Sequence, residues 1–199
     1  MKIIVIGGNG TIGKAVVKEL SSRHEVLTAG RHGGDLICDI TSEESIRSMF
    51  IKAQTFDALI MAVGNVHFEE FSHMTSAKYQ IGLNDKLMGQ VNCVLMGLEY
   101  IREGGSFTLT SGILSHDPIR TGSSASMVNG AIEGFVKGAA IEMSRQIRIN
   151  AICPTVLVES MDKYAPYFRG FVPVLAEKVA LAYSKSVEGL QTGQIFTVL

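Results

Sequence analysis

Short apolar runs alternate along the whole chain with longer segments of helical periodicity, and this alternation most limits the possible fold. Several of the short runs are apolar throughout, which is typical of parallel strands covered by helices on both faces. The runs that we expect to form strands are Lys2–Ile6, Glu25–Ala29, Asp35–Asp39, Asp57–Val63, Ser106–Thr110, Arg148–Cys153 and Gln194–Leu199. The segments that we expect to form helices are Thr11–Ser21, Ser42–Ala53, Ser76–Glu103, Ser123–Arg145 and Leu175–Val187.

Alternating strands and helices with right-handed crossovers predict an α/β protein. We expect a Rossmann-type, doubly wound parallel β-sheet of about seven strands flanked by helices. No internal repeat or linker interrupts the pattern, so residues 1–199 are expected to form a single nucleotide-binding domain.

The amino-acid composition limits the kinds of partner that the protein is expected to bind. The net charge is -1 and 46% of residues are hydrophobic, so neither disorder nor a nucleic-acid or anionic-membrane partner is expected. The apolar runs are shorter than the ~20 residues that cross a bilayer, and glycine interrupts the N-terminal run, so no membrane anchor or signal peptide is expected. Cys38, Cys93 and Cys153 are widely spaced, which predicts a cytoplasmic protein with no disulfide framework and no metal site.

The first expected strand leads directly into the glycine-rich segment GGNGTIG, residues 7–13. Both Gly8-x-Gly10-x-x-Gly13 and the wider Gly7-x-x-Gly10-x-x-Gly13 fit the pattern of a dinucleotide-binding loop. Glycines there allow a tight turn and let backbone amides approach a pyrophosphate at the start of the next helix. Because the loop lies between a strand and an amphipathic helix, we favour nucleotide binding over a turn that needs glycine only for packing.

The end of the second strand indicates which dinucleotide binds. NAD sites usually place an acid there for the adenosine ribose, whereas this chain has Gly30 and Arg31, followed by His32. A guanidinium can bind a 2′-phosphate through two hydrogen bonds. We therefore expect NADP (NADPH) to be preferred over NAD, with His32 as a second donor; an ordinary solvated arginine is the alternative.

These motifs and several later ones resemble the short-chain dehydrogenase/reductase (SDR) family over nearly the whole chain. CDIT, residues 38–41, resembles its adenine-contacting segment, and MAVG, residues 61–64, stands where the family has Asn-Asn-Ala-Gly. GGSFTLTSG, residues 104–112, resembles the strand that delivers a catalytic serine, here Ser111. IRINAICPT, residues 147–155, resembles the segment that frames the nicotinamide, and TGQIFTV resembles the last strand. The resemblance implies cofactor contacts from Gly7, Gly8, Asn9, Gly10, Thr11, Ile12, Gly13, Arg31, His32, Asp39, Ile40, Ala62, Val63, Gly64, Lys86, Asn129, Pro154 and Thr155.

The chain departs from the family at the residues that normally carry the chemistry. Aligning NGAIEGF, residues 129–135, with the family pattern places Ala125 at the catalytic tyrosine and Asn129 at the lysine. A register two residues earlier would give Ser123 and Met127 instead. In DKLMGQ, residues 85–90, Lys86 takes the place of the family's asparagine, so lysine and asparagine are exchanged between two helices.

Alanine cannot transfer a proton, so another group must do so if the protein is an enzyme. Lys86 is the leading candidate, because desolvation can bring the pKa of a lysine toward neutrality; the alternative is a lysine whose ammonium reaches water. Ser111 is expected to polarise a carbonyl or to bond to backbone. His116 is a possible acid or a solvated group, and Tyr79 is expected to face elsewhere. The serines at 123, 124 and 126 are expected to cap the helix.

Three functions are compatible with these residues. The first is an NADP(H)-dependent oxidoreductase with a rearranged active site (Ser111, Lys86 and Asn129) acting on a small carbonyl or alcohol. The second is a non-catalytic NADP(H)-binding redox sensor, which Ala125 favours, and the third, an isomerase or dehydratase, has no supporting residue. The resemblance also implies a homodimer through the long helices. The short segment between Pro154 and Leu175 predicts a substrate site that is open or completed by a partner.

Overall fold

The computed structural model of the protein describes all 199 residues. Its seven strands form one sheet in the order β3-β2-β1-β4-β5-β6-β7, and every neighbouring pair is parallel. The strands are β1 (Lys2–Ile6), β2 (Glu25–Gly30), β3 (Leu36–Ile37), β4 (Phe56–Met61), β5 (Ile101–Thr110), β6 (Arg148–Pro154) and β7 (Ile195–Val198). The expected Rossmann-type parallel sheet is confirmed.

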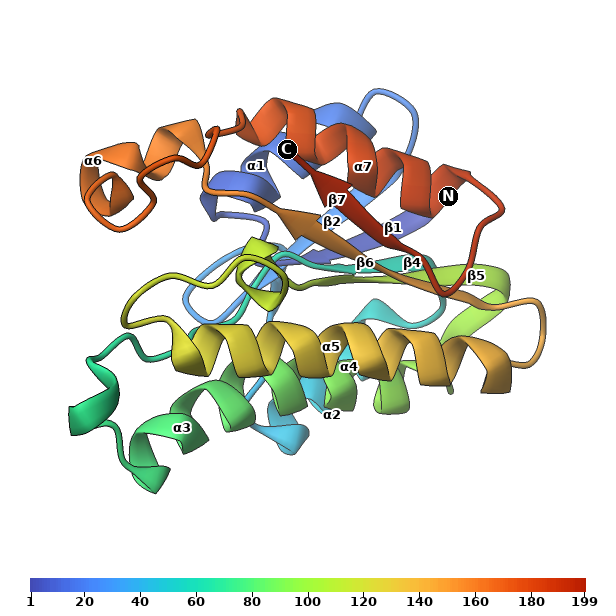
Figure 1. Ribbon diagram of the computed structural model, residues 1–199. Coiled ribbons are helices and arrows are strands. Elements are labelled where there is room, and N and C mark those ends of the chain that lie inside the picture. The colour runs from blue at the N-terminus through green and yellow to red at the C-terminus, as the bar shows by residue number, and fades with distance from the viewer.

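Helices cover both faces of this sheet, with α1 and α7 on one face and α2, α4 and α5 on the other (Figure 1). No helix is long and apolar enough to span a membrane. The helices are α1 (Thr11–Leu20), α2 (Glu43–Ala53), α3 (Ser76–Gly82), the π-helix η2 (Leu83–Met88), α4 (Gly89–Gly97), α5 (Ser123–Glu142), α6 (Met161–Tyr164) and α7 (Ala176–Glu188). Three short 3₁₀ turns complete the set: η1 (Phe71–His73), η3 (Ile113–Ser115) and η4 (Val158–Ser160).

The prediction of one continuous helix over residues 76–103 is wrong in two respects: the helix is not regular, and it ends earlier. It is interrupted by η2 and ends at Gly97, and Ile101–Glu103 already belong to β5. Ile101 pairs with Phe56 of β4 and is buried there, so sheet pairing and burial override the helical periodicity. The third strand is also shorter than expected, Leu36–Ile37 instead of residues 35–39.

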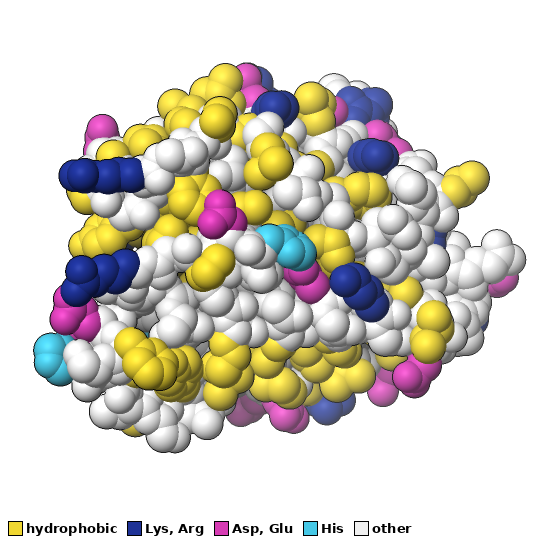
Figure 2. All heavy atoms as spheres, in the orientation of Figure 1, with side chains coloured by type: hydrophobic (Ala, Val, Ile, Leu, Met, Phe, Trp, Pro, Cys, Tyr) yellow, Lys and Arg dark blue, Asp and Glu magenta, His cyan; other side chains and the backbone are white.

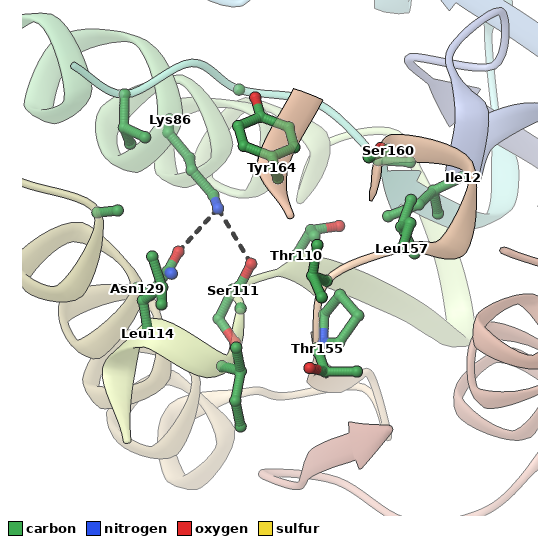
Figure 3. Close-up of a pocket in the computed structure, with 18 of the residues that line it drawn as sticks. Ile12, Lys86, Thr110, Ser111, Leu114, Asn129, Thr155, Leu157, Ser160 and Tyr164 are labelled. Atoms are coloured by element: carbon green, nitrogen blue, oxygen red, sulfur yellow. Dashed lines mark hydrogen bonds between the residues drawn. The ribbon is translucent and has the colours of Figure 1, made fainter. Parts of the chain in front are cut away.

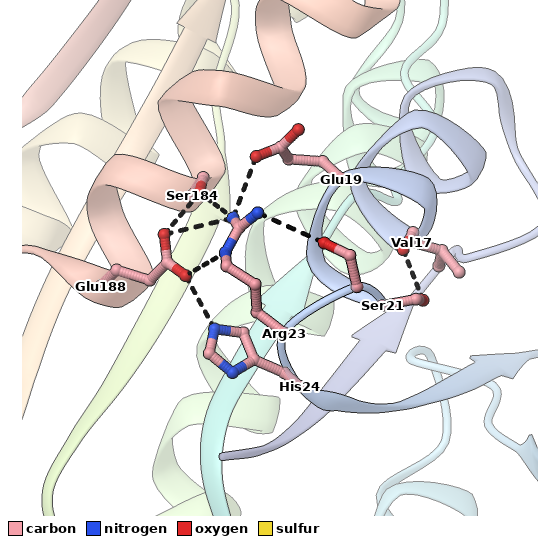
Figure 4. A network of polar contacts seen from close by, with 8 residues as sticks. Val17, Glu19, Ser21, Arg23, His24, Ser184 and Glu188 are labelled. Carbon is pink, nitrogen blue, oxygen red and sulfur yellow. Dashed lines mark hydrogen bonds and ion pairs between the residues drawn. The ribbon is translucent and has the colours of Figure 1, made fainter.

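A polar network joins α1 to α7 on the outer side of the sheet (Figure 4). Arg23, just after α1, donates to Glu188 at 2.9 Å and to Ser184 at 2.9 Å on α7, and to Glu19 at 3.0 Å. His24 lies 2.8 Å from the same Glu188 carboxylate. The hydrogen bond from Arg23 is the main cause that lowers the pKa of Glu188 to about 2. This network fixes the helix that follows the glycine loop against its neighbour.

The carboxyl ends of β1, β4, β5 and β6 lie together at one edge of the sheet. Strand order reverses direction between β1 and β4, and such a switch point is where doubly wound sheets bind ligands. The glycine loop follows β1, residues 62–64 follow β4, Ser111 follows β5, and Thr155 follows β6. The fold therefore brings the predicted motifs to one place.

Candidate active site

The loop after β1 has the geometry of a phosphate-binding cradle. Gly7 has a φ of +83°, and a side chain there would collide with the carbonyl oxygen of Ala62. A side chain at Gly13 would collide with the carbonyl oxygen of Gly7. The helix α1 begins at Thr11 with no side-chain cap at Gly10 and no acidic residue in its first turn. Its first amides are therefore free to bind an anion, as the pyrophosphate of a dinucleotide requires.

Arg31 lies at the end of β2, where we expect the adenosine ribose. Its side chain is 47% exposed, with Nε 3.3 Å from Asp39 and Nη2 3.7 Å from Asp85. Hydrogen bonds from Thr41, with a smaller contribution from Arg31, lower the pKa of Asp39 below its usual value. Asp39 and Asp85 both lie close enough to orient the Arg31 guanidinium, and His32 beside it is exposed.

The loop that carries Arg31 is anchored to β2. The Asp35 carboxylate accepts hydrogen bonds from the backbone amide and the hydroxyl of Thr28, both at 2.8 Å. The anchored loop approaches the glycine loop, since a Cβ at Gly33 would be 3.7 Å from the side-chain Nδ2 of Asn9. Ile40, the other residue expected at the adenine, is buried and packs against Gly89 of α4.

A cavity of about 330 Å³ opens beside the carboxyl ends of the central strands (Figure 3). It lies between the glycine loop, η2, α5 and the segment after β6. All three residues predicted to be catalytic line it, together with most of the residues expected at the nicotinamide end of a cofactor. The predicted residues that line the cavity are Ile12, Ala62, Val63, Gly64, Lys86, Ser111, Asn129, Pro154 and Thr155.

Lys86 directs its ammonium into this cavity. Nζ donates to Asn129 Oδ1 at 2.7 Å and to the carbonyl oxygen of Ser111 at 3.0 Å (Figure 3). Burial lowers the pKa of Lys86 to about 8. Because an ammonium has three N–H donors and two are in use, one donor is left for a ligand.

Asn129 lies on the buried face of α5, where its Oδ1 accepts the hydrogen bond from Lys86. The two residues that the alignment exchanges between helices are therefore in direct contact. One turn earlier on the same helix, Ala125 is buried among Ile113, Leu114 and Phe168 and offers only a methyl group to the cavity.

Lys86 lies in the π-helix η2, and π-helical turns often occur at functional sites. Two neighbours hold this turn in place. Gly64 has a φ of +123°, and a Cβ there would be 2.6 Å from the Lys86 side chain, so only glycine lets the two segments approach. Gln90, fully buried, donates to the carbonyl oxygens of Lys86 at 3.1 Å and Thr110 at 3.0 Å and accepts from the Thr110 amide at 2.8 Å. The sequence reasoning missed Gln90, although an amide side chain on an apolar helix face is a signal.

The Ser111 hydroxyl is directed away from Lys86. It donates to the buried carboxylate of Glu133 at 3.0 Å, which also accepts from Ser115 at 2.6 Å and lies 3.0 Å from His116 Nε2. His116, Glu133 and Cys153 bring their potential ligand atoms within 4.8 Å of one another. Two serines and an imidazole already satisfy Glu133, and its contact with Ser111 was not anticipated from the sequence.

The expectation that serines cap α5 is wrong. Gly122 is the N-cap and no side chain bonds to the first amides. The Ser123 hydroxyl lies 3.0 Å from the Tyr79 hydroxyl, while the hydroxyls of Ser124 and Ser126 have no hydrogen-bond partner. Tyr79 thus joins α3 to α5 and does not line the cavity.

The short segment after β6 contributes side chains to the wall of the cavity. It forms η4 and α6 and then returns to the strand end, where Val158 donates to the carbonyl oxygen of Val174 at 2.9 Å and Val174 donates to that of Val156 at 3.0 Å. Between these anchors, Tyr164 and Phe168 line the cavity. The expectation of a site that is open or completed by a partner stays a prediction, but the sequence did not reveal that Tyr164 and Phe168 line the cavity.

Comparison with known proteins agrees with this geometry. A family model described as Enoyl-(Acyl carrier protein) reductase matches residues 7–190. The crystal structure of the protein lin1944 from Listeria innocua is 49% identical, with a TM-score of 0.99 and full coverage of both chains. A small-chain dehydrogenase in complex with NADPH is 29% identical, with a TM-score of 0.90 over 100% of this chain and 96% of that one.

More distant structures share the fold. A short-chain dehydrogenase/reductase from Serratia marcescens is 18% identical, with a TM-score of 0.82 over 99% of this chain and 94% of that one. No curated protein matches the sequence. The family match spans most of the chain, and the glycine loop, the parallel sheet and the cavity agree with it. The chain belongs to the short-chain dehydrogenase/reductase family.

Proposed function

We propose that the protein is an NADP(H)-dependent oxidoreductase that reduces a small carbonyl compound, with Lys86 in place of the usual tyrosine as proton donor. The observation that carries the proposal is the position of Lys86: its ammonium enters the cavity, two of its donors are held by Asn129 and Ser111, and burial lowers its pKa to about 8. A group with a pKa near neutrality is suited to general acid catalysis.

The chain's own residues fit the cofactor. The glycine loop from Gly7 to Gly13 would hold the pyrophosphate, and the segments at residues 62–64 and at Pro154 and Thr155 would flank the nicotinamide end. Asn129 is placed to hold a ribose hydroxyl, since its Nδ2 makes no hydrogen bond within the protein. When bound, NADPH supplies the hydride that reduces the carbonyl carbon.

The proton is the part of the reaction that this chain must provide. The free N–H of Lys86 would donate to the substrate oxygen as negative charge develops there, and the resulting amine would regain a proton from water. Asn129 and the Ser111 carbonyl hold Nζ in place during this exchange. Ser111 would contribute mainly through its backbone, because its hydroxyl proton is directed to Glu133.

We also propose a preference for NADP over NAD, based on the exposed guanidinium of Arg31 at the end of β2. A 2′-phosphate would compete with Asp39 and Asp85 for this side chain. The neighbouring small-chain dehydrogenase in complex with NADPH supports NADP(H) as the cofactor. Three free, buried cysteines agree with a reducing, cytoplasmic location.

A homodimer through α4 and α5 is the oligomer that we propose. Figure 2 shows hydrophobic side chains in a row along the lower part of the molecule, over α5 and the helices beside it. Leu95 is 55% exposed and Met127 is 42% exposed. On α5, side chains at Gly130, Gly134 and Gly138 would meet nothing within 4 Å, so a second helix has room to approach.

Two measurements on the purified protein test the function. Calorimetric titration should show NADPH binding, and mixing the complex with a panel of small ketones and aldehydes should oxidise NADPH, followed by its absorbance. Binding without oxidation across the panel would favour the redox sensor, which Ala125 already makes the second candidate. Absence of binding would overturn the proposal.

A further inference from the structure

One side of the cavity is built from aromatic rings of two separate segments. Phe68 follows β4, and Tyr164 and Phe168 belong to the segment after β6; all three line the cavity. The Phe68 and Tyr164 ring centroids are 6.5 Å apart, and those of Tyr164 and Phe168 are 6.2 Å apart in an edge-on arrangement. These spacings are typical of interacting aromatic pairs. Phe171 supports the set from behind, 5.2 Å from Phe168.

Packing within the protein leaves part of this aromatic surface exposed. Phe68 is 39% exposed and Tyr164 is partly exposed, although both contact other rings. The Tyr164 ring is positioned by its neighbours Phe68 and Phe168 and by the Lys163 ammonium, 5.1 Å from its centroid, and no hydrogen bond fixes its hydroxyl. Aromatic surface that faces a cavity is the usual lining of a ligand site.

The same cavity offers little to a charged substrate. None of its lining residues carries a carboxylate, and Lys86 is its only cation. That ammonium already has two partners, Asn129 and the Ser111 carbonyl. A charged substituent inside the cavity would lose its hydration and find no further ionic partner among the lining side chains. Lys163, whose Nζ lies 5.1 Å from the Tyr164 ring centroid, is exposed and does not line the cavity.

We infer that the substrate is an uncharged compound with its carbonyl group attached to, or next to, a single aromatic ring. This inference rests on the proposed carbonyl reduction. The aromatic side chains bind the ring while Lys86 faces the carbonyl oxygen. The volume of about 330 Å³ is at the small end of ligand cavities, and because the nicotinamide takes part of it, one ring fits better than a fused or extended system. Phe68 and Tyr164 are then specificity-determining residues.

Three matched probes test the substrate class by ligand-observed NMR titration, which needs no turnover. Acetophenone is aromatic and uncharged, 1-cyclohexylethanone has a similar shape without aromaticity, and 4-acetylbenzoate adds one negative charge to the ring. With NADP⁺ present, acetophenone should bind about tenfold more tightly than 4-acetylbenzoate and several-fold more tightly than the cyclohexyl ketone. Equal affinity for all three, or tightest binding of the carboxylate, would overturn the inference.

Two variants test whether acetophenone binds at the aromatic side of the cavity. Tyr164→Ala and Phe68→Ala should each weaken acetophenone binding by about five- to tenfold, because each removes one ring contact. Phe71→Ala is the control, since Phe71 is 77% exposed and lies outside the cavity. Circular dichroism checks that each variant is folded. Unchanged acetophenone binding in both cavity variants would contradict the assignment.

The same titration separates this inference from the function it extends. The aromatic side chains belong to the chain itself, so acetophenone should bind, and Tyr164→Ala should weaken it, even in protein without nucleotide. If that holds while NADPH oxidation fails, the reduction is wrong and the aromatic subsite stands. If NADPH reduces aliphatic and charged ketones as well as acetophenone, the reduction stands and the substrate class is wrong.

Discussion

At the scale of single residues, the chemistry that we propose depends on how the environment changes the pKa of one lysine. A lysine in water has a pKa of about 10.4 and is a weak acid at neutral pH. In the cavity, burial lowers the pKa of Lys86 to about 8, while Asn129 keeps its Nζ at 2.7 Å. The exchange of lysine and asparagine was visible in the sequence, but the contact between them was not, because the two residues are 43 positions apart.

The first prediction concerns the acid form of Lys86. Carbonyl reduction needs the protonated ammonium, so kcat/KM should be constant at low pH and fall as the pH rises through about 8. Lys86→Met should lower the rate by about 10²–10⁴-fold and remove this alkaline limb. Lys137→Met, at an exposed site on α5, is the matched control and should behave like the unmodified protein. An alkaline limb that persists in Lys86→Met would assign the proton to another group.

The second prediction concerns Arg31. Arg31→Ala should raise the Kd for NADPH by about 10–100-fold, the value expected for losing charge-assisted hydrogen bonds, and should leave the Kd for NADH nearly unchanged. Calorimetric titrations with both nucleotides measure this. His32→Ala should have a smaller effect, because we expect its imidazole to be only a second donor. Equal loss for both nucleotides would remove Arg31 from 2′-phosphate recognition.

At the scale of elements, the site depends on a helix that is not regular. The sequence predicted one helix over residues 76–103, because the apolar spacing continues through the region. It did not reveal the π-helix η2, which depends on contacts with distant residues: Gln90 bonds to Thr110 on β5, and Gly64 packs against Lys86. The glycine loop was predictable because its pattern is local. The hydrogen bond between Ser111 and Glu133 and the aromatic side of the cavity could not be predicted. Both depend on segments that are distant in the sequence and meet only in the folded protein.

The third prediction tests this packing. Gly64→Ala should lower the Tm by about 3–10 °C, since alanine is strained at a φ of +123°, and should reduce carbonyl reduction strongly because the new Cβ displaces Lys86. Gly104→Ala is the matched control: its φ is +73° and a Cβ there meets nothing within 4 Å. The control should lose thermal stability but keep its kcat/KM. Similar activity in both variants would show that Gly64 has no special role at Lys86.

At the scale of the whole molecule, the two faces of the sheet have different roles. The face covered by α1 and α7 is closed by the Arg23–Glu188 network and fixes the nucleotide loop. The other face carries Lys86 and Asn129 on helices whose outer surface is apolar and rich in glycine. The parallel sheet was predictable from the alternation of strands and helices, because several strands, such as β1 and β4, are short and almost wholly apolar.

The fourth prediction concerns the dimer. Gly134→Leu should be compatible with the folded chain, because a side chain there meets nothing within 4 Å, but it should block close approach of a second α5. Size-exclusion chromatography with light scattering should then show monomers for this variant and dimers for the unmodified protein. Leu181→Glu, on an exposed site of α7, is the control and should remain dimeric. A dimeric Gly134→Leu protein would place the interface elsewhere.

The π-helix η2 also constrains the number of residues between α3 and α4. Each residue turns a helix by about 100°, so one residue more or fewer in residues 83–88 rotates α3 relative to α4. Gly82, before the stretch, packs on Val128 of α5, and Gly89, after it, packs on Ile40. A single deletion would turn one of these glycines away from its neighbour and bring a bulkier side chain into its place. The rotation of α3 relative to α4, fixed by these two contacts, therefore directs Lys86. Apart from Lys86 itself, we expect substitutions in residues 83–88 to be tolerated more readily than any insertion or deletion.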